Sequence, residues 1–438
     1  MVDLAEAPAV IPAEGSGDPA LTRARLKLAA VCMVGLGVAT TVLPFWAVDA
    51  SRGPMMLELG WGADQLSVSY ALMLWAAALS VWPIGLLIDR LGARLMVAAG
   101  AVAIAPILLM LPFVRHFWQF CILFALLGVC RSVVLGYSKI VATLFDRRRG
   151  LALGVFAAEV SALSMMLPLG TSRLVSENGW RGAFTILGLV VLVVAPVLYI
   201  GLGKREPGAA DAERSARADW RASQAIRTRT FWLIIVAALV SEGVSGIVLN
   251  ALQTALPHRG FGDIAYLRGA PLILLATLAG PICAGFLLDR TRSPAMAVAA
   301  FLASAAAGLM SSFVTPSMGG MPLLMTSFVL GAFAFSAQAP VVAYLLSRYF
   351  GLKSFATIWS LQIFIQAVAM GLAIPRLAPL AGPIGNEPLL MAMGTAAPLI
   401  AALLYLLLPP FNDGANREPG LDGQSPRAFR TWWSRAPS

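Results

Sequence analysis

Residues 85–94 read GLLIDRLGAR, and the related stretch GFLLDR stands at residues 285–290. Each copy places a Gly four residues before an Asp-Arg pair, and each follows a long apolar segment. The copies start 200 residues apart in a chain of 438 residues. A repeat at this spacing indicates that the chain consists of two related halves.

The segments around these repeats are too apolar for a protein that faces water. Hydrophobic residues make up 59% of the chain and charged residues only 12%, whereas a soluble domain carries about 25% charged residues. Leu28–Val48 and Leu66–Ile88 contain no charge, and each has the roughly 20 residues that a helix needs to cross a bilayer. Because lipid cannot bond to backbone amides, such segments must be helical.

Twelve segments meet this description: Leu28–Val48, Leu66–Ile88, Leu95–Val114, Phe117–Phe145, Leu151–Ser172, Ala183–Gly203, Phe231–Leu256, Gly269–Leu288, Pro294–Val314, Met321–Ser347, Phe355–Pro375 and Leu389–Leu408. We therefore predict an all-α membrane protein of twelve transmembrane helices in two pseudo-symmetric six-helix bundles. The predicted parts are a tail (1–27), the first bundle (28–203), a polar linker (204–229), the second bundle (230–409) and a second tail (410–438).

The basic residues predict the orientation. With the N-terminus inside, the cytoplasmic loops and tails hold 23 Lys and Arg residues and the outer loops hold 7. This bias predicts a bacterial inner (plasma) membrane protein with both termini cytoplasmic. It also accounts for the net charge of +10 without nucleic acid as a partner.

GLLIDRLGAR resembles the loop signature of the major facilitator superfamily. The resemblance implies the major facilitator fold and a cytoplasmic gate. The predicted gating residues are Gly85, Asp89, Arg90, Arg94, Gly285, Asp289 and Arg290. Gly85 would let two helices approach closely, and Asp89 would accept bonds from arginines or from the start of a helix in the opposite half.

A second resemblance is narrower. LFDRRRGLALGVFAAE at residues 144–159 is similar to the motif that opens helix 5 in the monocarboxylate and oxalate/formate branch of this superfamily. RYFGLKSFATI at residues 348–358 looks like the matching loop of the second half. This resemblance implies a proton-coupled symporter for a monocarboxylate-like anion.

Four ionisable residues lie deep in the predicted spans: Arg131, Lys139, Glu159 and Glu242. Burying a charge in lipid is costly, so we expect them to face the protein interior or a wet cavity. Lys139 and Glu159 have similar predicted depths, which fits either a structural ion pair or a proton-coupling pair. Arg131 is a candidate for binding the substrate anion, with a structural role as the alternative.

Glu242 lies at a depth comparable to that of Arg131 and is a candidate proton carrier, with a hydrogen bond to a neighbouring helix as the alternative. It could neutralise Arg131 until substrate displaces it and it takes up a proton. Neutral substrate contacts are expected from Asn250, Gln338 and Gln362, and Gln366 could assist. For each of these amides an interhelix hydrogen bond is the other explanation.

Several functions are disfavoured. The four cysteines form no CxxC pair, only two histidines exist, and no GxxxxGK[ST] phosphate loop occurs, so we expect no metal, no cofactor and no catalytic residue. A membrane enzyme would need a clustered polar site, and a channel would need a continuous polar pore. The sequence instead predicts a monomeric secondary transporter in the lipid bilayer that moves a small organic anion with protons. The alternative is a permease or exporter for a siderophore-like, peptide-like or drug-like solute.

Overall fold

A computed structural model gives the fold of residues 19–38, 42–145, 148–202, 220–255, 265–291, 295–312, 320–381 and 387–409. Across these ranges the chain is helical and contains no β-strand. Seven helical stretches within them are long and apolar enough to cross a membrane. These observations confirm the predicted all-α membrane fold.

The first half contains α1 (Pro19–Val38), α2 (Val42–Leu59), α3 (Ala63–Leu91), α4 (Ala93–Met110), the 3₁₀ helix η1 (Leu111–Phe113), α5 (Phe117–Arg131), α6 (Val134–Leu144) and α7 (Arg149–Gly201). The first predicted span falls on α1 and α2, and the fourth falls on α5 and α6. α7 covers the fifth and sixth spans, and the chain turns between them at Gly179, where φ is 66°. Glycine tolerates this positive φ without strain.

The second half contains the short helix α9 (Ala222–Ala225), followed by α10 (Arg229–Ala255), α11 (Ala265–Thr291), α12 (Ala295–Ser312), α13 (Gly320–Phe350), α14 (Phe355–Ala381) and α15 (Glu387–Leu406). Each of the six long helices overlaps one predicted span of this half. Residues 203–219 of the predicted linker lie outside the described ranges.

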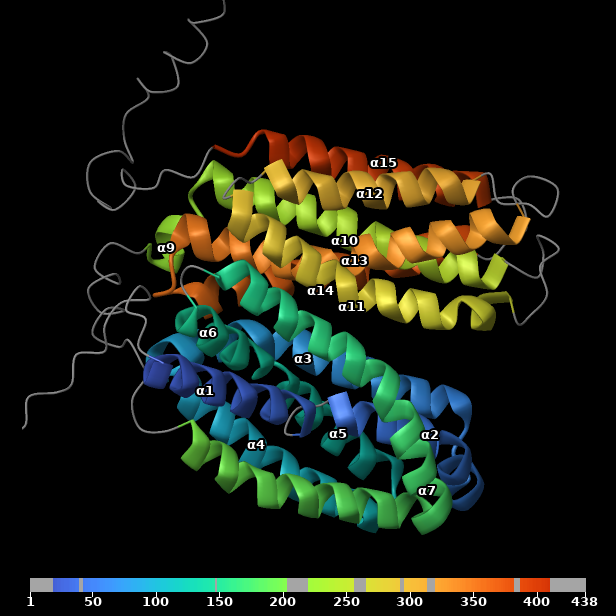
Figure 1. The fold of residues 1–438 in the computed structure, drawn as a ribbon. Helices are drawn as coiled ribbons and strands as arrows, with labels where there is room; N and C mark the ends of the chain where they lie inside the picture. Colours follow the sequence, from blue (N-terminus) through green and yellow to red (C-terminus); the bar gives the residue numbers. More distant parts are fainter. Residues whose placement is uncertain are drawn as a thin grey trace, which may run out of the picture.

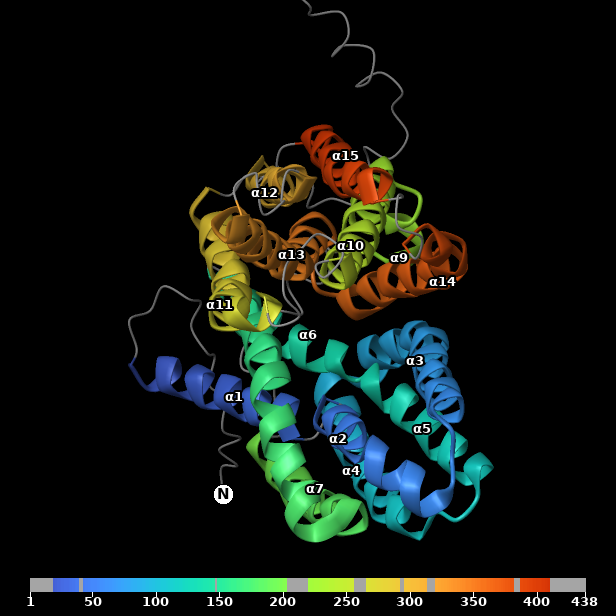
Figure 2. The ribbon, with the colours of Figure 1, turned by 90° about the vertical axis from the view of Figure 1, so that its right-hand side faces the viewer.

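The two groups of helices lie side by side, as Figures 1 and 2 show. They meet along two pairs of helices, because α3 packs along α14 and α7 packs along α11. α3 and α11 finish at the same end of the molecule at which α7 and α14 begin, near α9. We call this the inner end, since the basic residues predict that it faces the cytoplasm.

Each half has its own apolar core. Phe120 and Phe124 stack in the first half with ring centroids 4.2 Å apart, and Phe301 and Tyr405 stack in the second at 4.7 Å. Large apolar side chains also cover outer faces, where Ile200 is 75% exposed. Such exposure would be unfavourable in water and is expected of a helix that faces lipid.

Candidate gate and transport site

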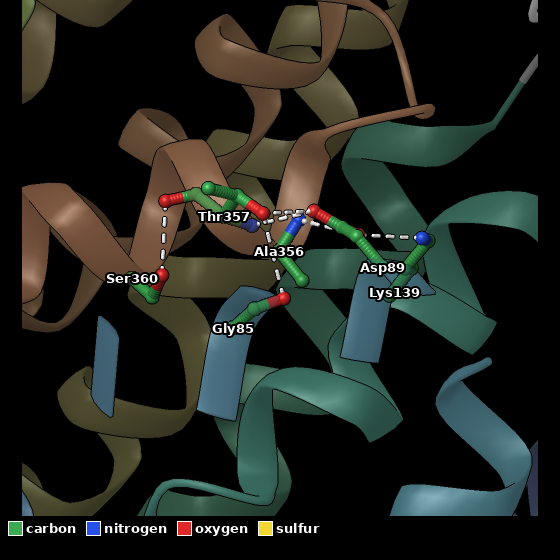
Figure 3. A network of polar contacts seen from close by, with 6 residues as sticks. All are labelled: Gly85, Asp89, Lys139, Ala356, Thr357 and Ser360. Carbon is green, nitrogen blue, oxygen red and sulfur yellow. Dashed lines mark hydrogen bonds and ion pairs between the residues drawn. The ribbon is translucent and has the colours of Figure 1, made fainter. Parts of the chain in front are cut away.

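Asp89, near the end of α3, binds the start of α14 in the opposite half (Figure 3). Its carboxylate accepts hydrogen bonds from the backbone N–H of Ala356 (3.3 Å) and from the backbone N–H and hydroxyl of Thr357 (2.7 and 2.6 Å). The first amides of a helix lack partners within the helix and carry its positive dipole end, so a carboxylate stabilises them. The predicted contact of Asp89 with a helix of the opposite half is confirmed.

Gly85 allows α3 to come this close to α14. A Cβ at this position would lie 2.1 Å from the Ser360 Oγ atom and 2.7 Å from the Ala356 carbonyl oxygen. The Thr357 hydroxyl also lies 3.5 Å from the Gly85 carbonyl oxygen. Any larger residue would therefore push the two helices apart.

The second copy of the motif makes the equivalent contact on the other side of the molecule. Asp289, near the end of α11, accepts hydrogen bonds from the backbone N–H groups of Gly150 and Leu151 at the start of α7, both 2.8 Å long. A Cβ on Gly285 would lie 2.1 Å from the Gly150 carbonyl oxygen. The duplicated motif thus places an aspartate on a helix start of the opposite half twice, which confirms the predicted contact of Asp289.

The arginines of the motif behave differently from the aspartates. Arg90 and Arg290 are exposed, and no hydrogen bond or ion pair of theirs is recorded among the described residues. Arg94 is partly buried at the same end. The arginine that joins the halves is Arg149, whose guanidinium donates to the carbonyl oxygens of Ala142 (3.2 Å) and Ser347 (3.4 Å). The sequence analysis matched the RRR run of residues 147–149 to a family motif but did not predict this contact between the halves.

The expected pairing of Lys139 with Glu159 is wrong. The Lys139 ammonium lies 2.6 Å from the Asp89 carboxylate, and the two side chains are 14% and 10% exposed. Lys139 is five residues from the end of α6 and Glu159 is ten residues into α7, which places them about 7.5 and 15 Å from the inner end. The lysine therefore reaches the nearer carboxylate, that of Asp89.

Glu159 lies on α7 in the region that faces α1. Leu163, one turn further along α7, packs against Gly37 of α1. One carboxylate oxygen of Glu159 is buried and accepts no hydrogen bond. The ion pairs recorded in the described part of the chain do not include it.

Glu242 joins a chain of side chains that links α10 to α14. The Gln366 amide donates to the Glu242 carboxylate (2.6 Å), and the Gln362 amide donates to the Gln366 oxygen (2.6 Å). Gln362 is 3% exposed. The interhelix hydrogen bond that was the other explanation for these amides is therefore present. Within the described residues Glu242 is bonded to Gln366 and not to Arg131.

Arg131 lies at a break in the fourth span. α5 ends at Arg131 and α6 begins at Val134, and the amides of Ser132 and Val133 bond three residues back instead of four. The Ser132 hydroxyl lies 3.1 Å from that of Ser80 on α3. Arg131 is exposed, and no partner for it is recorded in the described ranges. No proline marks this break in the sequence, and the break places a cation where α5 ends.

Gln338 is not on an accessible surface. It is 0% exposed within the second half, and neither its amide nitrogen nor its oxygen has a hydrogen-bond partner. The expectation that it contacts substrate therefore does not fit this arrangement. The side chain of Asn250 lies outside the described part of the structure. Within that part, no group of three His, Cys, Asp or Glu side chains could hold a metal ion.

Two related six-helix halves, joined at one end by a pair of aspartate contacts, define a polytopic membrane transport protein. More particularly, the chain belongs to the Major Facilitator Superfamily, whose family model matches residues 28–374. The solved structures agree on the fold. The chain is similar to the transporter FucP in its outward conformation (TM-score 0.66, 13% identity, covering 88% of this chain and 98% of FucP). It is also similar to the proton:xylose symporter XylE (TM-score 0.69, 16% identity, 89% and 96%).

Relatives found by sequence match mostly over part of their length. The uncharacterized MFS-type transporter YcxA of Bacillus subtilis is 30% identical over 161 residues, or 36% of this chain and 39% of YcxA. The probable L-galactonate transporter of Escherichia coli is 24% identical over 330 residues, or 71% and 67%. The multidrug resistance protein MdtG of Salmonella choleraesuis is 31% identical over 110 residues, or 25% and 27%. The chain thus spans about two fifths, two thirds and a quarter of these relatives.

Proposed function

We propose that this protein is a proton-coupled secondary transporter that moves a small organic anion across the bacterial inner membrane by alternating access. It acts as a monomer with both termini and the linker of residues 204–229 in the cytoplasm. The two halves, residues 28–203 and 230–409, rock against each other around a site near the middle of the membrane. The observation that carries this proposal is the pair of aspartate contacts, Asp89 on α14 and Asp289 on α7.

These contacts close the inner end and must break when the protein opens inward. Each consists of hydrogen bonds between a carboxylate and the start of a helix in the other half, so both are lost when the halves separate at this end. Gly85, Asp89, Gly285 and Asp289 therefore form the gate, and Lys139 and Arg149 reinforce it. The structure then corresponds to the outward-facing state, which is also the state of the FucP structure that the chain resembles.

The anionic substrate is proposed from Arg131. A guanidinium at the break of a membrane-spanning helix can hold a carboxylate through two parallel hydrogen bonds. Gln362 and Asn250 are proposed as neutral contacts. One relative is named a probable L-galactonate transporter, and galactonate is itself a carboxylate. The branch of the superfamily is left open, because Gly269–Leu288 contains no charged residue that could serve as a second anion anchor.

Glu242 and Glu159 are proposed as proton carriers. Both are carboxylates within the membrane-spanning part, and a charged carboxylate there is costly without a cationic partner. Neither has such a partner among the described residues. Coupling to protons also agrees with the symporter XylE, which shares the fold.

The test is uptake of labelled carboxylates, L-galactonate among them, into proteoliposomes with and without an imposed pH gradient. We expect saturable uptake that the gradient accelerates and that Arg131→Ala abolishes. Labelled xylose and a cationic dye serve as neutral and drug-like comparators. Uptake of the dye but of no carboxylate would refute the anion proposal and support the drug-like alternative that MdtG suggests.

A further inference from the structure

The second half contains buried polar groups that no protein atom satisfies. The Ser241 hydroxyl on α10, both polar atoms of the Gln338 amide on α13 and the Tyr405 hydroxyl on α15 have no hydrogen-bond partner. Ser241 and Gln338 are 0% exposed and Tyr405 is 1% exposed. Buried polar groups in folded proteins are nearly always hydrogen-bonded to protein or to ordered water, so three exceptions in one half require an explanation.

Ser241 and Gln338 lie at similar depth. The ring of Phe231 on α10 contacts that of Phe350 on α13, with centroids 6.3 Å apart, so these rings define a common level. Ser241 is ten residues beyond Phe231 and Gln338 is twelve residues before Phe350, which corresponds to about 15 and 18 Å. Because glutamine is long, the two side chains can reach the same place.

Tyr405 extends toward this level from the inner end. The Tyr349 hydroxyl bonds the Pro409 carbonyl oxygen (2.5 Å), which ties the end of α15 to the end of α13. Tyr405 is four residues before Pro409, and side chains on a helix lean toward its N-terminus, here toward the middle of the membrane. The stacked ring of Phe301 at 4.7 Å fixes its orientation.

The faces that carry these groups pack against one another. Residues one turn from Ser241 (Ala237 and Ala238), residues one turn from Gln338 (Val341 and Val342) and Tyr405 itself belong to one buried cluster. The polar groups therefore lie next to the buried apolar contact between α10, α13 and α15. Glu242 follows Ser241 directly, and the Tyr405 hydroxyl lies within electrostatic range of its carboxylate.

We propose that Ser241, Gln338 and Tyr405 line an internal water site, and that Glu242 exchanges its proton with the inner side through this site. This inference rests on the proposed role of Glu242 as a proton carrier. One or two water molecules would satisfy the four polar atoms, because a buried water needs two to four polar partners. The Glu242 acid gives its proton to a water molecule of this site, that proton leaves for the inner side as part of a hydronium ion, and Glu242 remains as the carboxylate. The Tyr405 hydroxyl and the Gln338 amide hold the water in place by hydrogen bonds.

The helices packed against α10 carry few other ionisable residues. Gln362 and Gln366 of α14 bind Glu242 but are not ionisable. α12 has no ionisable residue. The remaining ionisable residues of these helices are Tyr344, Arg348 and Tyr349 on α13, Arg376 on α14 and Glu387 on α15. The Tyr344 hydroxyl donates to the Leu288 carbonyl oxygen (3.4 Å).

The experiment detects the protonated Glu242 carboxyl by infrared spectroscopy. Its C=O stretching band is assigned as the band that is missing in Glu242→Gln. Hydrogen–deuterium exchange at this carboxyl is timed in liposomes after a change to deuterated buffer on the inner side. Gln338→Leu and Tyr405→Phe should slow the exchange at least about tenfold, as expected when the groups that position a proton-transferring water are lost. Tyr344→Phe, which removes another buried hydroxyl of this half, is the control and should leave the exchange rate unchanged.

The outcomes separate the two proposals. If no pH-dependent band depends on Glu242, the role of Glu242 in coupling fails. If the band is present but Gln338→Leu and Tyr405→Phe exchange as fast as wild type, the water site is refuted and the coupling role stands. A dry site would also make Gln338→Leu more stable to heat than wild type, since the change removes an unsatisfied amide. Tyr405→Phe, which preserves shape, keeps the test valid if Gln338→Leu does not fold.

Discussion

The ammonium of Lys139 lies 2.6 Å from the carboxylate of Asp89, and both side chains are largely buried. The same carboxylate bonds the start of α14, so one aspartate neutralises a lysine of its own half and holds a helix of the other half. Asp289 accepts hydrogen bonds from two backbone amides at the start of α7, and Arg149 and Arg348 lie within electrostatic range of its carboxylate. The two contacts are therefore related by the repeat but differ in the cation beside the aspartate, a lysine for Asp89 and arginines for Asp289.

Asp89→Asn should shift the protein toward the inward-open state. The change keeps the shape of the side chain but removes the charge, and hydrogen bonds to charged groups contribute about 1.5–3 kcal/mol. The inward-open population should therefore rise about ten- to hundredfold, and transport should slow with little change in substrate affinity. Spin labels at the inner ends of α3 and α14 would measure the populations. Asp64→Asn, at the other end of α3, is the control, and an equal shift there would argue against the gate.

Lys139 and Asp89 should be energetically coupled, and Lys139 and Glu159 should not. In a double-mutant cycle, Lys139→Met and Asp89→Asn should show an interaction free energy of about 0.5–3 kcal/mol. For Lys139→Met and Glu159→Gln, the changes in unfolding free energy should be additive, because Glu159 lies deeper than Lys139. Thermal unfolding in detergent gives these energies. Strong coupling in the second cycle would mean that the lysine visits Glu159 in another state.

Gly85→Ala should separate α3 from α14 at the inner end. Its Cβ would lie 2.1 Å from Ser360 Oγ, a distance that cannot be tolerated, and overpacking of this kind costs about 1–3 kcal/mol. Gly285→Ala should act in the same way on α11 and α7. Gly170→Ala is the matched control, because a Cβ there meets no atom within 4 Å. Reactivity of a cysteine introduced at the inner end should rise in the first two variants only.

Glu58 should make stability depend on pH at the outer end of the first half. It accepts hydrogen bonds from the Arg181 guanidinium (2.9 Å) and the Trp180 indole (2.5 Å), and these bonds lower the pKa of its carboxyl. A lowered pKa means that the stabilisation is complete above the unfolded value and is lost as the pH falls through the folded value. The melting temperature should therefore drop on acidification below about pH 4.5, and Glu58→Gln should flatten this part of the profile.

The sequence predicted the helices well because their cause is local. Twenty apolar residues must form a helix in lipid, so each predicted span overlaps a described helix. Asp89 and Asp289 could be placed on helix starts because the repeated motif contains the glycine, the aspartate and the loop together. These two contacts were thus predictable from residues that lie close in the chain.

The partners of single charges could not be predicted in this way. Whether Lys139 pairs with Asp89 or with Glu159 depends on how α6 packs against α3 and α7. The choice is decided by a difference of a few residues between the depths of Lys139 and Glu159. The break at Ser132 has no proline, and it arises where α5 packs tightly on α3, with Gly128 against the Met73 carbonyl. Such tertiary packing overrides local helix propensity.

Arg131 tests the substrate class. Its guanidinium can hold a carboxylate through two parallel hydrogen bonds, whereas a lysine keeps the charge but cannot make this bidentate contact. Arg131→Lys should therefore weaken carboxylate binding by about 1–2 kcal/mol, the loss of one or two net hydrogen bonds. Binding is measured by titration calorimetry in detergent with the carboxylate identified by uptake. Arg115→Lys, in an exposed loop, is the control. Unchanged affinity in Arg131→Lys would show that Arg131 acts as a charge or a structural residue and does not grip the anion directly.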